Sequence, residues 1–231
     1  MAWAFSNVAA SVEADVVQVQ NVPYPTVNAG DIIFLANAAG PIGQAAPTLA
    51  DTDFQPVVNR TSSGSMYLYW KIANGTESGT MTLTRSTNSG QCYSQMCAFT
   101  GGPTTLTGNI HTTNTAGGGS AATLPYPALT ITVPNCLVIA LASKPSNSFG
   151  WNVPAPFTAK ISESHATAGM CMLWEYAIQT TATSITAGTF TATTDVANSR
   201  TGVAAVFLPA SAAPIPFPPT SLGGMNVQVC M

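Results

Sequence analysis

Charged residues are scarce in this chain: only 6% of its 231 residues are Asp, Glu, Lys or Arg, against about a quarter in ordinary soluble domains. The net charge is −3, so Thr, Ser, Asn and Gln must supply most of the polar surface. Such a surface keeps a free monomer in solution poorly, but it suits an assembled component, because charged residues are depleted at interface cores. The composition therefore favours a structural protein that works in contact with other subunits.

The few cations are scattered singly along the chain, as Arg60, Lys71, Arg85, Lys144, Lys160 and Arg200. Binding to nucleic acid through phosphates needs clustered cations, so this class of function is set aside. No apolar run approaches the roughly 20 residues that span a bilayer. The first residues lack the cationic start and long apolar core of a signal peptide. We therefore expect synthesis in a cytoplasm, use without export, and no contact with membrane.

Residues that carry chemistry are also few. The two histidines, His111 and His165, lie in loop-like sequence without an obvious partner. Asp51 and Asp53 have the spacing that begins a calcium loop, but the following residues supply no further oxygen ligands. A turn in which the Asp side chains bond the local backbone is the better interpretation. We expect no catalytic residue, no cofactor and no metal site, and hence a protein that is not an enzyme.

The five cysteines are odd in number and form no Cys-x-x-Cys pair, which argues against a disulfide framework and against a zinc knuckle. Cys97, Cys136 and Cys171 lie inside apolar strand patterns, where a free cysteine behaves as a small hydrophobe. Buried free thiols are therefore expected.

What the chain does contain is an internal repeat. The first copy comprises residues 23–25, 30–35, 66–70, 79–84 and 96–99. The second comprises residues 125–127, 135–140, 171–174, 188–193 and 204–207, at an offset of 102 to 109. Pro-Tyr-Pro opens both copies, a Gly-Thr-x-Thr-x-Thr or closely similar segment lies inside both, and a short apolar segment ending in Phe closes both. A repeat of this kind indicates a duplicated structural unit.

Both copies are made of strand patterns separated by turn formers, and no amphipathic helix is evident. In 80–84 the apolar Met81 and Leu83 alternate with threonines, and Phe190 is expected to face inward in the same way. Residues 66–72 are apolar on both faces, which is typical of a strand that is covered on both sides. The sequence thus predicts an all-β protein with antiparallel sheets.

Two arrangements of the copies remain open. The halves, about 12–102 and 123–209 with a Thr- and Gly-rich linker between them, either build one jelly-roll-like sandwich or form two small sandwiches in tandem. We favour the single duplicated sandwich, spanning residues 1–209. Residues 210–231 then form an extended, Pro-rich C-terminal arm, because prolines at this density favour a polyproline conformation.

The arm ends in an alternating segment, 225–231, that resembles a short strand and is expected to add to the sheet edge of a neighbouring subunit. Aromatic residues on strands or in loops are the other candidates for intermolecular contact. The candidate interface residues are Tyr67, Tyr69, Trp151, Pro216, Pro218, Val227 and Val229. Whether Tyr67 and Tyr69 face a second sheet or another subunit is open at this stage.

The layout of 30–34, 67–72, 79–84 and 98–102 resembles a recurrent class of tailed-bacteriophage virion proteins. The resemblance covers about residues 12–208 and implies a β-sandwich attached to a phage particle, without an enzymatic role. The leading hypothesis is a capsid decoration or cement protein that binds the major capsid protein as a homo-oligomer and stabilises the shell. The alternative is a tail or fibre component that binds a host-surface glycan through loop aromatics such as Trp151.

Overall fold

The computed structural model describes residues 2–40, 45–60, 65–105, 110–117, 123–126, 128–144, 151–152, 155, 157, 159–163, 171–192 and 201–207. Within these ranges the regular structure consists of strands and contains no helix. The strands are β1 (Ala4–Val8), β2 (Val12–Pro23), β3 (Ile32–Gly40), β4 (Thr48–Leu49), β5 (Gln55–Arg60), β6 (Ser65–Ile72), β7 (Thr80–Thr100), β8 (Ile110–Gly117), β9 (Thr123–Tyr126), β10 (Cys136–Lys144), β11 (Trp151–Asn152), β12 (Ala159–Glu163), β13 (Cys171–Gln179), β14 (Gly188–Ala192) and β15 (Thr201–Phe207). All the strand pairings are antiparallel, so the predicted all-β class is confirmed.

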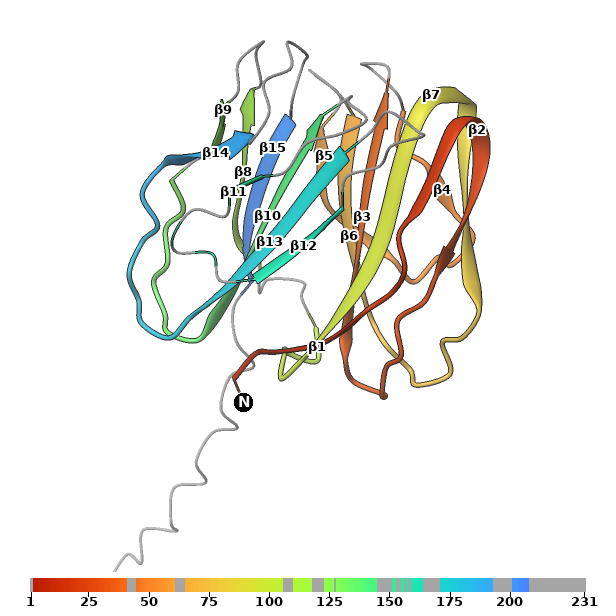
Figure 1. The fold of residues 1–231 in the computed structure, drawn as a ribbon. Coiled ribbons are helices and arrows are strands. Elements are labelled where there is room, and N and C mark those ends of the chain that lie inside the picture. Colours follow the sequence, from red (N-terminus) through yellow and green to blue (C-terminus); the bar gives the residue numbers. More distant parts are fainter. Residues whose placement is uncertain are drawn as a thin grey trace, which may run out of the picture.

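The first half of the chain forms a seven-stranded sheet in the order β1-β7-β3-β6-β5, with β2 and β4 also paired to β7. Strand β7 is long and bends over together with β2 (Figure 1). Its second part pairs with β3, whereas its first part pairs with the end of β2 and with β4. The bend coincides with a break in register, from Val17↔Ser89 to Val19↔Thr84. One strand therefore belongs to a large inner layer and to a small outer layer.

The second half has the same strand order, divided into two sheets. A five-stranded sheet runs β12-β13-β10-β15-β8, and a three-stranded sheet runs β11-β14-β9. The registers also match: Ile32 pairs with Ile72 and Phe99, and Leu137 pairs with Ile178 and Phe207. Corresponding positions of the two halves can therefore be named residue by residue. Descent of the halves from one duplicated segment stays a prediction.

The two large layers pack face to face and form the central core. Phe34 contacts Phe207 at 4.8 Å between ring centroids, and Phe99 contacts Tyr176 edge-on at 5.0 Å. A second core lies between the first large layer and its outer strands, and a third between the second large layer and its outer sheet. The described strands thus stack as outer, large, large and outer layers.

This stacking explains the strands that are apolar on both faces. In β6, Met66, Leu68 and Trp70 point into the central core, while Tyr67 and Tyr69 point into the outer core of the same half. The alternation predicted for this strand is confirmed, as is the inward position of Met81, Leu83 and Phe190. A strand enclosed between two cores needs mainly apolar side chains on both of its faces.

Each half builds its own large and outer layers, and the two halves share a core. The choice between one sandwich over residues 1–209 and two in tandem stays a prediction. Strand β7 continues through Ser89 and Gly90, although Ser-Gly is typical of a turn, because β2 stays paired with it. The predicted linker contains β8, a polar edge strand that lacks a hydrophobic pattern. Jelly-roll connectivity stays a prediction, and residues 210–231 lie outside the described residues.

Candidate functional site

The loop that follows β6 lies beside a group of ion pairs. Lys71, at the end of β6, places its Nζ 2.7 Å from Oδ2 of Asp51 and 3.0 Å from Oε1 of Glu77. The Tyr24 hydroxyl donates a hydrogen bond to the same Asp51 oxygen at 2.5 Å. The ammonium group also lies over the rings of Tyr24 and Phe54, at 5.8 and 5.7 Å from their centroids. The charged groups and the two rings together fill the space beside the loop that follows β6. We call this region, and its equivalent beside the loop after β13, the corner of each half.

The pKa values of this cluster follow from burial and pairing. Burial would raise the pKa of Asp51, but hydrogen bonds from Lys71 and Tyr24 outweigh it, and the pKa lies below its ordinary value. Glu77 behaves similarly, because backbone N–H groups and Lys71 stabilise its carboxylate. Burial would lower the pKa of Lys71, but its two carboxylate partners raise it. All three groups are therefore held in their charged forms, which is the behaviour of a structural ion cluster.

Asp51 also fulfils the turn role that the sequence predicts. Its Oδ1 accepts a hydrogen bond from the backbone N–H of Asp53 at 3.0 Å, while Oδ2 binds Lys71 and Tyr24. The sequence did not indicate the second role, because Lys71 and Glu77 are distant in the chain and form no motif with it.

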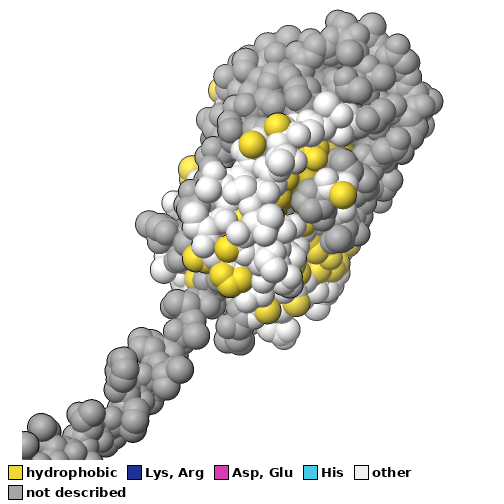
Figure 2. Space-filling model, turned by 90° about the vertical axis from the view of Figure 1, so that its left-hand side faces the viewer, with side chains coloured by type: hydrophobic (Ala, Val, Ile, Leu, Met, Phe, Trp, Pro, Cys, Tyr) yellow, Lys and Arg dark blue, Asp and Glu magenta, His cyan; other side chains and the backbone are white. Residues whose placement is uncertain are grey.

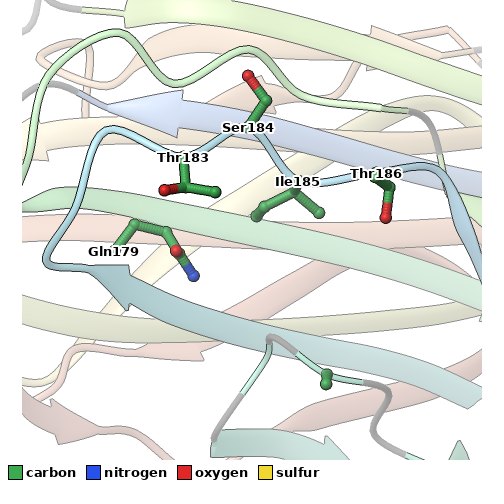
Figure 3. Close-up of a pocket in the computed structure, with 6 residues that line it drawn as sticks. Gln179, Thr183, Ser184, Ile185 and Thr186 are labelled. Atoms are coloured by element: carbon green, nitrogen blue, oxygen red, sulfur yellow. The ribbon is translucent and has the colours of Figure 1, made fainter.

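The corresponding corner of the second half contains a hollow of about 250 Å³. It lies between the end of β13, the loop 180–187 and Ala155, and its lining residues are Ala155, Gln179, Thr183, Ser184, Ile185 and Thr186 (Figure 3). Its polar side chains are one amide and three hydroxyls, and none carries a charge. Thr183, Ile185 and Thr186 point to one side of the loop backbone, and Ser184 points to the other.

The loop that borders this hollow is held by hydrogen bonds to the segment before β10. Leu129 and Ile185 exchange two backbone hydrogen bonds of 2.9 Å each, and the Ser184 hydroxyl accepts one from the Ile131 N–H at 3.4 Å. The side chain of Ile185 is buried in the outer core of this half. The position of the loop, and with it the shape of the hollow, is therefore set by the protein's own hydrogen bonds.

The two corners differ in what fills them. Lys71 pairs with Ile33 in the first half, and the corresponding pair in the second is Ala177 with Val138. Tyr126 stands in the place of Tyr24, beside Gly188 where Tyr24 is beside Gly79. Its hydroxyl donates to the Ala155 carbonyl at 3.3 Å instead of to a carboxylate. The ion cluster thus has no counterpart among the described residues of the second corner, and the hollow lies there.

A third polar group, buried between the layers of the first half, surrounds Arg85. Its guanidinium donates to Oδ1 of Asn37 at 2.6 Å, and Asn37 donates to the Ser94 hydroxyl at 2.7 Å. Ser94 in turn donates to Gln20 on β2 at 2.7 Å. Arg85 is 2% exposed. This network links β2, β3 and β7 across the bend, so its role is structural.

The surface that remains is almost uncharged. Of the charged side chains that the structure describes, Asp53 alone is exposed; Glu13, Asp31, Asp51, Lys71, Glu77, Arg85 and Glu175 are buried or half-buried. Figure 2 shows the face that carries the outer sheet of the second half, and its described atoms are polar uncharged groups with scattered apolar side chains. The scarcity of charge in the sequence is thus greater still on the described surface.

Of the predicted interface residues, the structure describes the side chains of Tyr67 and Tyr69. Tyr67 and Tyr69 are buried, at 0% and 7% exposure, in the outer core of the first half, and the expectation that they contact another subunit is wrong for the folded chain. They are covered because the end of β2 and the start of β7 fold over β6. Burial raises the pKa of the Tyr69 hydroxyl to about 12.

Trp151 was expected in a loop, but its backbone pairs with Ala192 in the short strand β11. Pro216, Pro218, Val227 and Val229 lie outside the described residues. Cys92, Cys97 and Cys136 are buried free thiols, as the sequence predicts.

Two other kinds of feature, a metal site and a membrane-spanning helix, are not found among the described residues. In the part of the chain that the structure describes, no three His, Cys, Asp or Glu side chains come close enough together to hold a metal ion. The same residues include no helix of the length and apolarity needed to cross a membrane. Comparison of the chain with protein-family models, curated proteins and solved structures found no match in any of the three.

Proposed function

We propose that this protein is a non-enzymatic structural component of a bacteriophage virion, and specifically a decoration protein that binds the outside of the capsid and stabilises it. The observation that supports this proposal best is the use of charge. Among the described charged side chains, all but Asp53 are turned into the body of the protein or half-covered by it. A described surface with so little charge keeps a free monomer in solution poorly but is well suited to close contact with other subunits.

The architecture supports the same proposal. Large layers that are enclosed on both faces give a rigid body, and rigid bodies bind with little loss of conformational entropy. The N-terminal strand and the end of β15 also lie at one end of the molecule, because Trp3 packs in the central core with Ile32 and Phe207. Phe207, the last described residue, therefore lies at the same end as the N-terminal strand. Attachment through this end would leave the outer sheets free.

Such a protein would stabilise a shell through thermodynamic linkage between its binding and capsid assembly. A protein that binds only the assembled capsid lowers the free energy of that state and opposes rupture. Many copies held by several modest contacts each would add avidity without a large interface per copy. The partners in this proposal are the major capsid protein and further copies of the chain.

The direct test is co-sedimentation of the purified protein with emptied phage shells that lack it, titrated to saturation. We expect binding that saturates at a whole-number ratio to the major capsid protein, and shells that resist heating better when occupied. Binding to isolated tails or to host cells, with none to shells, would refute the decoration role and favour the tail or fibre alternative.

The C-terminal residues provide a second prediction. Deletion of residues 210–231 is expected to weaken attachment to shells while leaving the melting temperature of the free protein within a few degrees of the full chain. The physical reason is that the described members of the three cores all lie between Trp3 and Phe207. Circular dichroism melting and shell co-sedimentation of the same preparation provide the two measurements. A large loss of thermal stability would show instead that the segment belongs to the core.

A further inference from the structure

We propose that the hollow beside the loop 180–187 is a binding site for a single neutral sugar unit, such as the terminal residue of an uncharged glycan. This inference goes beyond the decoration role and does not depend on it. Three features of the described residues carry it: the chemistry of the lining, the fixed shape of the loop, and the contrast with the corresponding corner of the first half.

The chemistry of the lining selects for a neutral ligand rich in hydroxyl groups. The Gln179 amide offers two donor hydrogens and an acceptor, and the hydroxyls of Thr183 and Thr186 each donate and accept. Sugar hydroxyls have the same dual character, so either direction of each hydrogen bond is available. Ala155 and Ile185 add an apolar surface against which the C–H face of a sugar ring can lie. None of the six described lining residues carries a charge that would attract an ion.

The volume limits the ligand to one ring. At about 250 Å³ the hollow is smaller than the 300–1,000 Å³ typical of drug-sized pockets. A ligand with so few atoms binds weakly, and a dissociation constant on the order of 1 mM is expected for one site. Repetition of the site on an assembled particle would raise the effective affinity greatly through avidity.

The loop needs little rearrangement to bind. The paired backbone hydrogen bonds between Leu129 and Ile185, and the one that Ser184 accepts, hold the loop against the segment before β10. This leaves Thr183 and Thr186 exposed and pointing away from the Ser184 hydroxyl (Figure 3). Preorganisation of this kind lowers the entropy cost of binding.

The first half shows what the same corner looks like when it is closed. There Lys71 extends between two aromatic rings and joins Asp51 and Glu77, so the space is filled by the protein's own charges. In the second half the lysine position is Ala177 and the tyrosine bonds a backbone carbonyl. The corresponding corners of the two halves therefore differ: in the first the ion cluster fills the space, and in the second the space is open and its described lining is uncharged. We infer that the open corner is the one that receives a ligand.

The test is ligand-observed NMR, by saturation transfer, on the full chain with the methyl glycosides of glucose, galactose, mannose and N-acetylglucosamine. Glucuronic acid is the charged counterpart, and glycerol reports adventitious polyol contact. We expect saturable transfer to at least one neutral glycoside and a much weaker signal with glucuronic acid. No saturable binding of any of the four glycosides would overturn the proposal, as would an equally strong signal from glycerol.

Variants locate the binding. Ala155→Phe places a ring in the hollow from an exposed position, and is expected to abolish the signal. Gln179→Ala and Thr186→Val each remove hydrogen-bonding groups and are expected to weaken binding about threefold to tenfold. Thr189→Val is the matched control, because Thr189 is exposed on β14 and does not line the hollow.

Binding that persists unchanged in Ala155→Phe, in a protein with an unchanged melting temperature, would also overturn the proposal. If Ala155→Phe does not fold, the double variant Gln179→Ala, Thr186→Val decides instead, because both positions are exposed or half-exposed at the surface. Unchanged binding in this double variant would place the sugar elsewhere.

Discussion

At the scale of single residues, the protein uses its few charges to hold its own layers together. Lys71 is 4% exposed and has two carboxylate partners, and Arg85 is 2% exposed within a chain of amide and hydroxyl groups. Removing water from a charge costs several kcal/mol unless partners replace the lost hydration. Lys71 is compensated by its two carboxylates, whereas Arg85 has a bond from one Nη to Asn37 and no hydrogen-bond partner at Nε or the other Nη among the described residues. The loss of Lys71 is therefore expected to reduce stability.

Replacement of Lys71 by Met is expected to destabilise the fold by about 3 kcal/mol near neutral pH, because Asp51 and Glu77 would be left without their cation. Urea denaturation measures the change. Asp53→Asn is the matched control: Asp53 is exposed and its side chain lies outside the cluster, so a change below about 0.5 kcal/mol is expected. Equal effects of the two variants would show that the ion cluster contributes nothing specific.

The same cluster predicts a pH dependence with a definite sign. The pKa values of Asp51 and Glu77 are depressed on folding, so their contribution is present above the unfolded value of about 4 and is lost as the pH falls through the depressed values. The pKa of Lys71 is raised, so its contribution is present below about 10.4 and is lost as the pH rises through the raised value. Stability should therefore be level between these limits and fall outside them.

The Lys71→Met variant makes this dependence testable. Without the cation, burial raises the carboxylate pKa values on folding, and the variant should gain stability relative to the parent as the pH falls below about 4. A difference between the two proteins that stays constant from pH 3 to pH 7 would contradict the assigned pKa shifts.

At the scale of elements, the paired strands β2 and β7 connect the two layers of the first half. They carry one half of the chain from a large layer to an outer layer without breaking strand pairing, and the buried network of Arg85, Asn37 and Ser94 lies at the bend. Strand β7 then ends in a turn against the N-terminal segment. Gly101 has a φ of +78° there, and a Cβ on it would lie 2.0 Å from the Ala2 carbonyl oxygen.

Gly101→Ala is therefore expected to destabilise the protein by clearly more than the roughly 1–2 kcal/mol that a left-handed backbone costs an L-residue. Gly79→Ala is the matched control, because Gly79 has a φ of +68° but open space around its Cα. Thermal or urea denaturation of both variants separates backbone strain from steric contact. Equal losses in the two variants would mean that the N-terminal segment moves aside freely.

At the scale of the whole molecule, the shared central core makes the two halves depend on each other. The ring of Phe34 in the first half lies 4.8 Å from that of Phe207 in the second, and both side chains are fully buried. Neither large layer can expose this face to water without losing a substantial part of its burial. The halves are thus expected to unfold together, although their strands pair only within each half in the described residues.

A double-mutant cycle measures this dependence. Phe34→Ala and Phe207→Ala are each expected to cost about 3–5 kcal/mol, with a coupling of about 0.5–1.5 kcal/mol between the rings. Phe34→Ala combined with Phe190→Ala is the control, because Phe190 lies in a different core and the effects should add. Calorimetry should show one transition for the parent protein. Two separate transitions, or no coupling between Phe34 and Phe207, would mean that the halves are independent domains.

The sequence by itself determined the class of fold, several strands of both halves, the two-faced pattern of 66–72 and the inward direction of Met81, Leu83 and Phe190. The pattern of 66–72 was informative because a strand has only two faces, and the residues on both faces of this strand were mainly apolar. Buried free cysteines followed from the same patterns. These are local properties, set by the period of two along a strand.

Only the tertiary structure decided how the layers stack and where polar groups meet. The union of Lys71, Asp51 and Glu77, the burial of Tyr67 and Tyr69 under β2 and β7, and the hollow beside Gln179 all depend on residues that are distant in sequence. Strand β8 escaped prediction because an edge strand needs no apolar face, and its Thr-rich sequence resembles a linker. The period of a strand fixes which way a side chain points, but what it points at depends on which other strand the fold brings there.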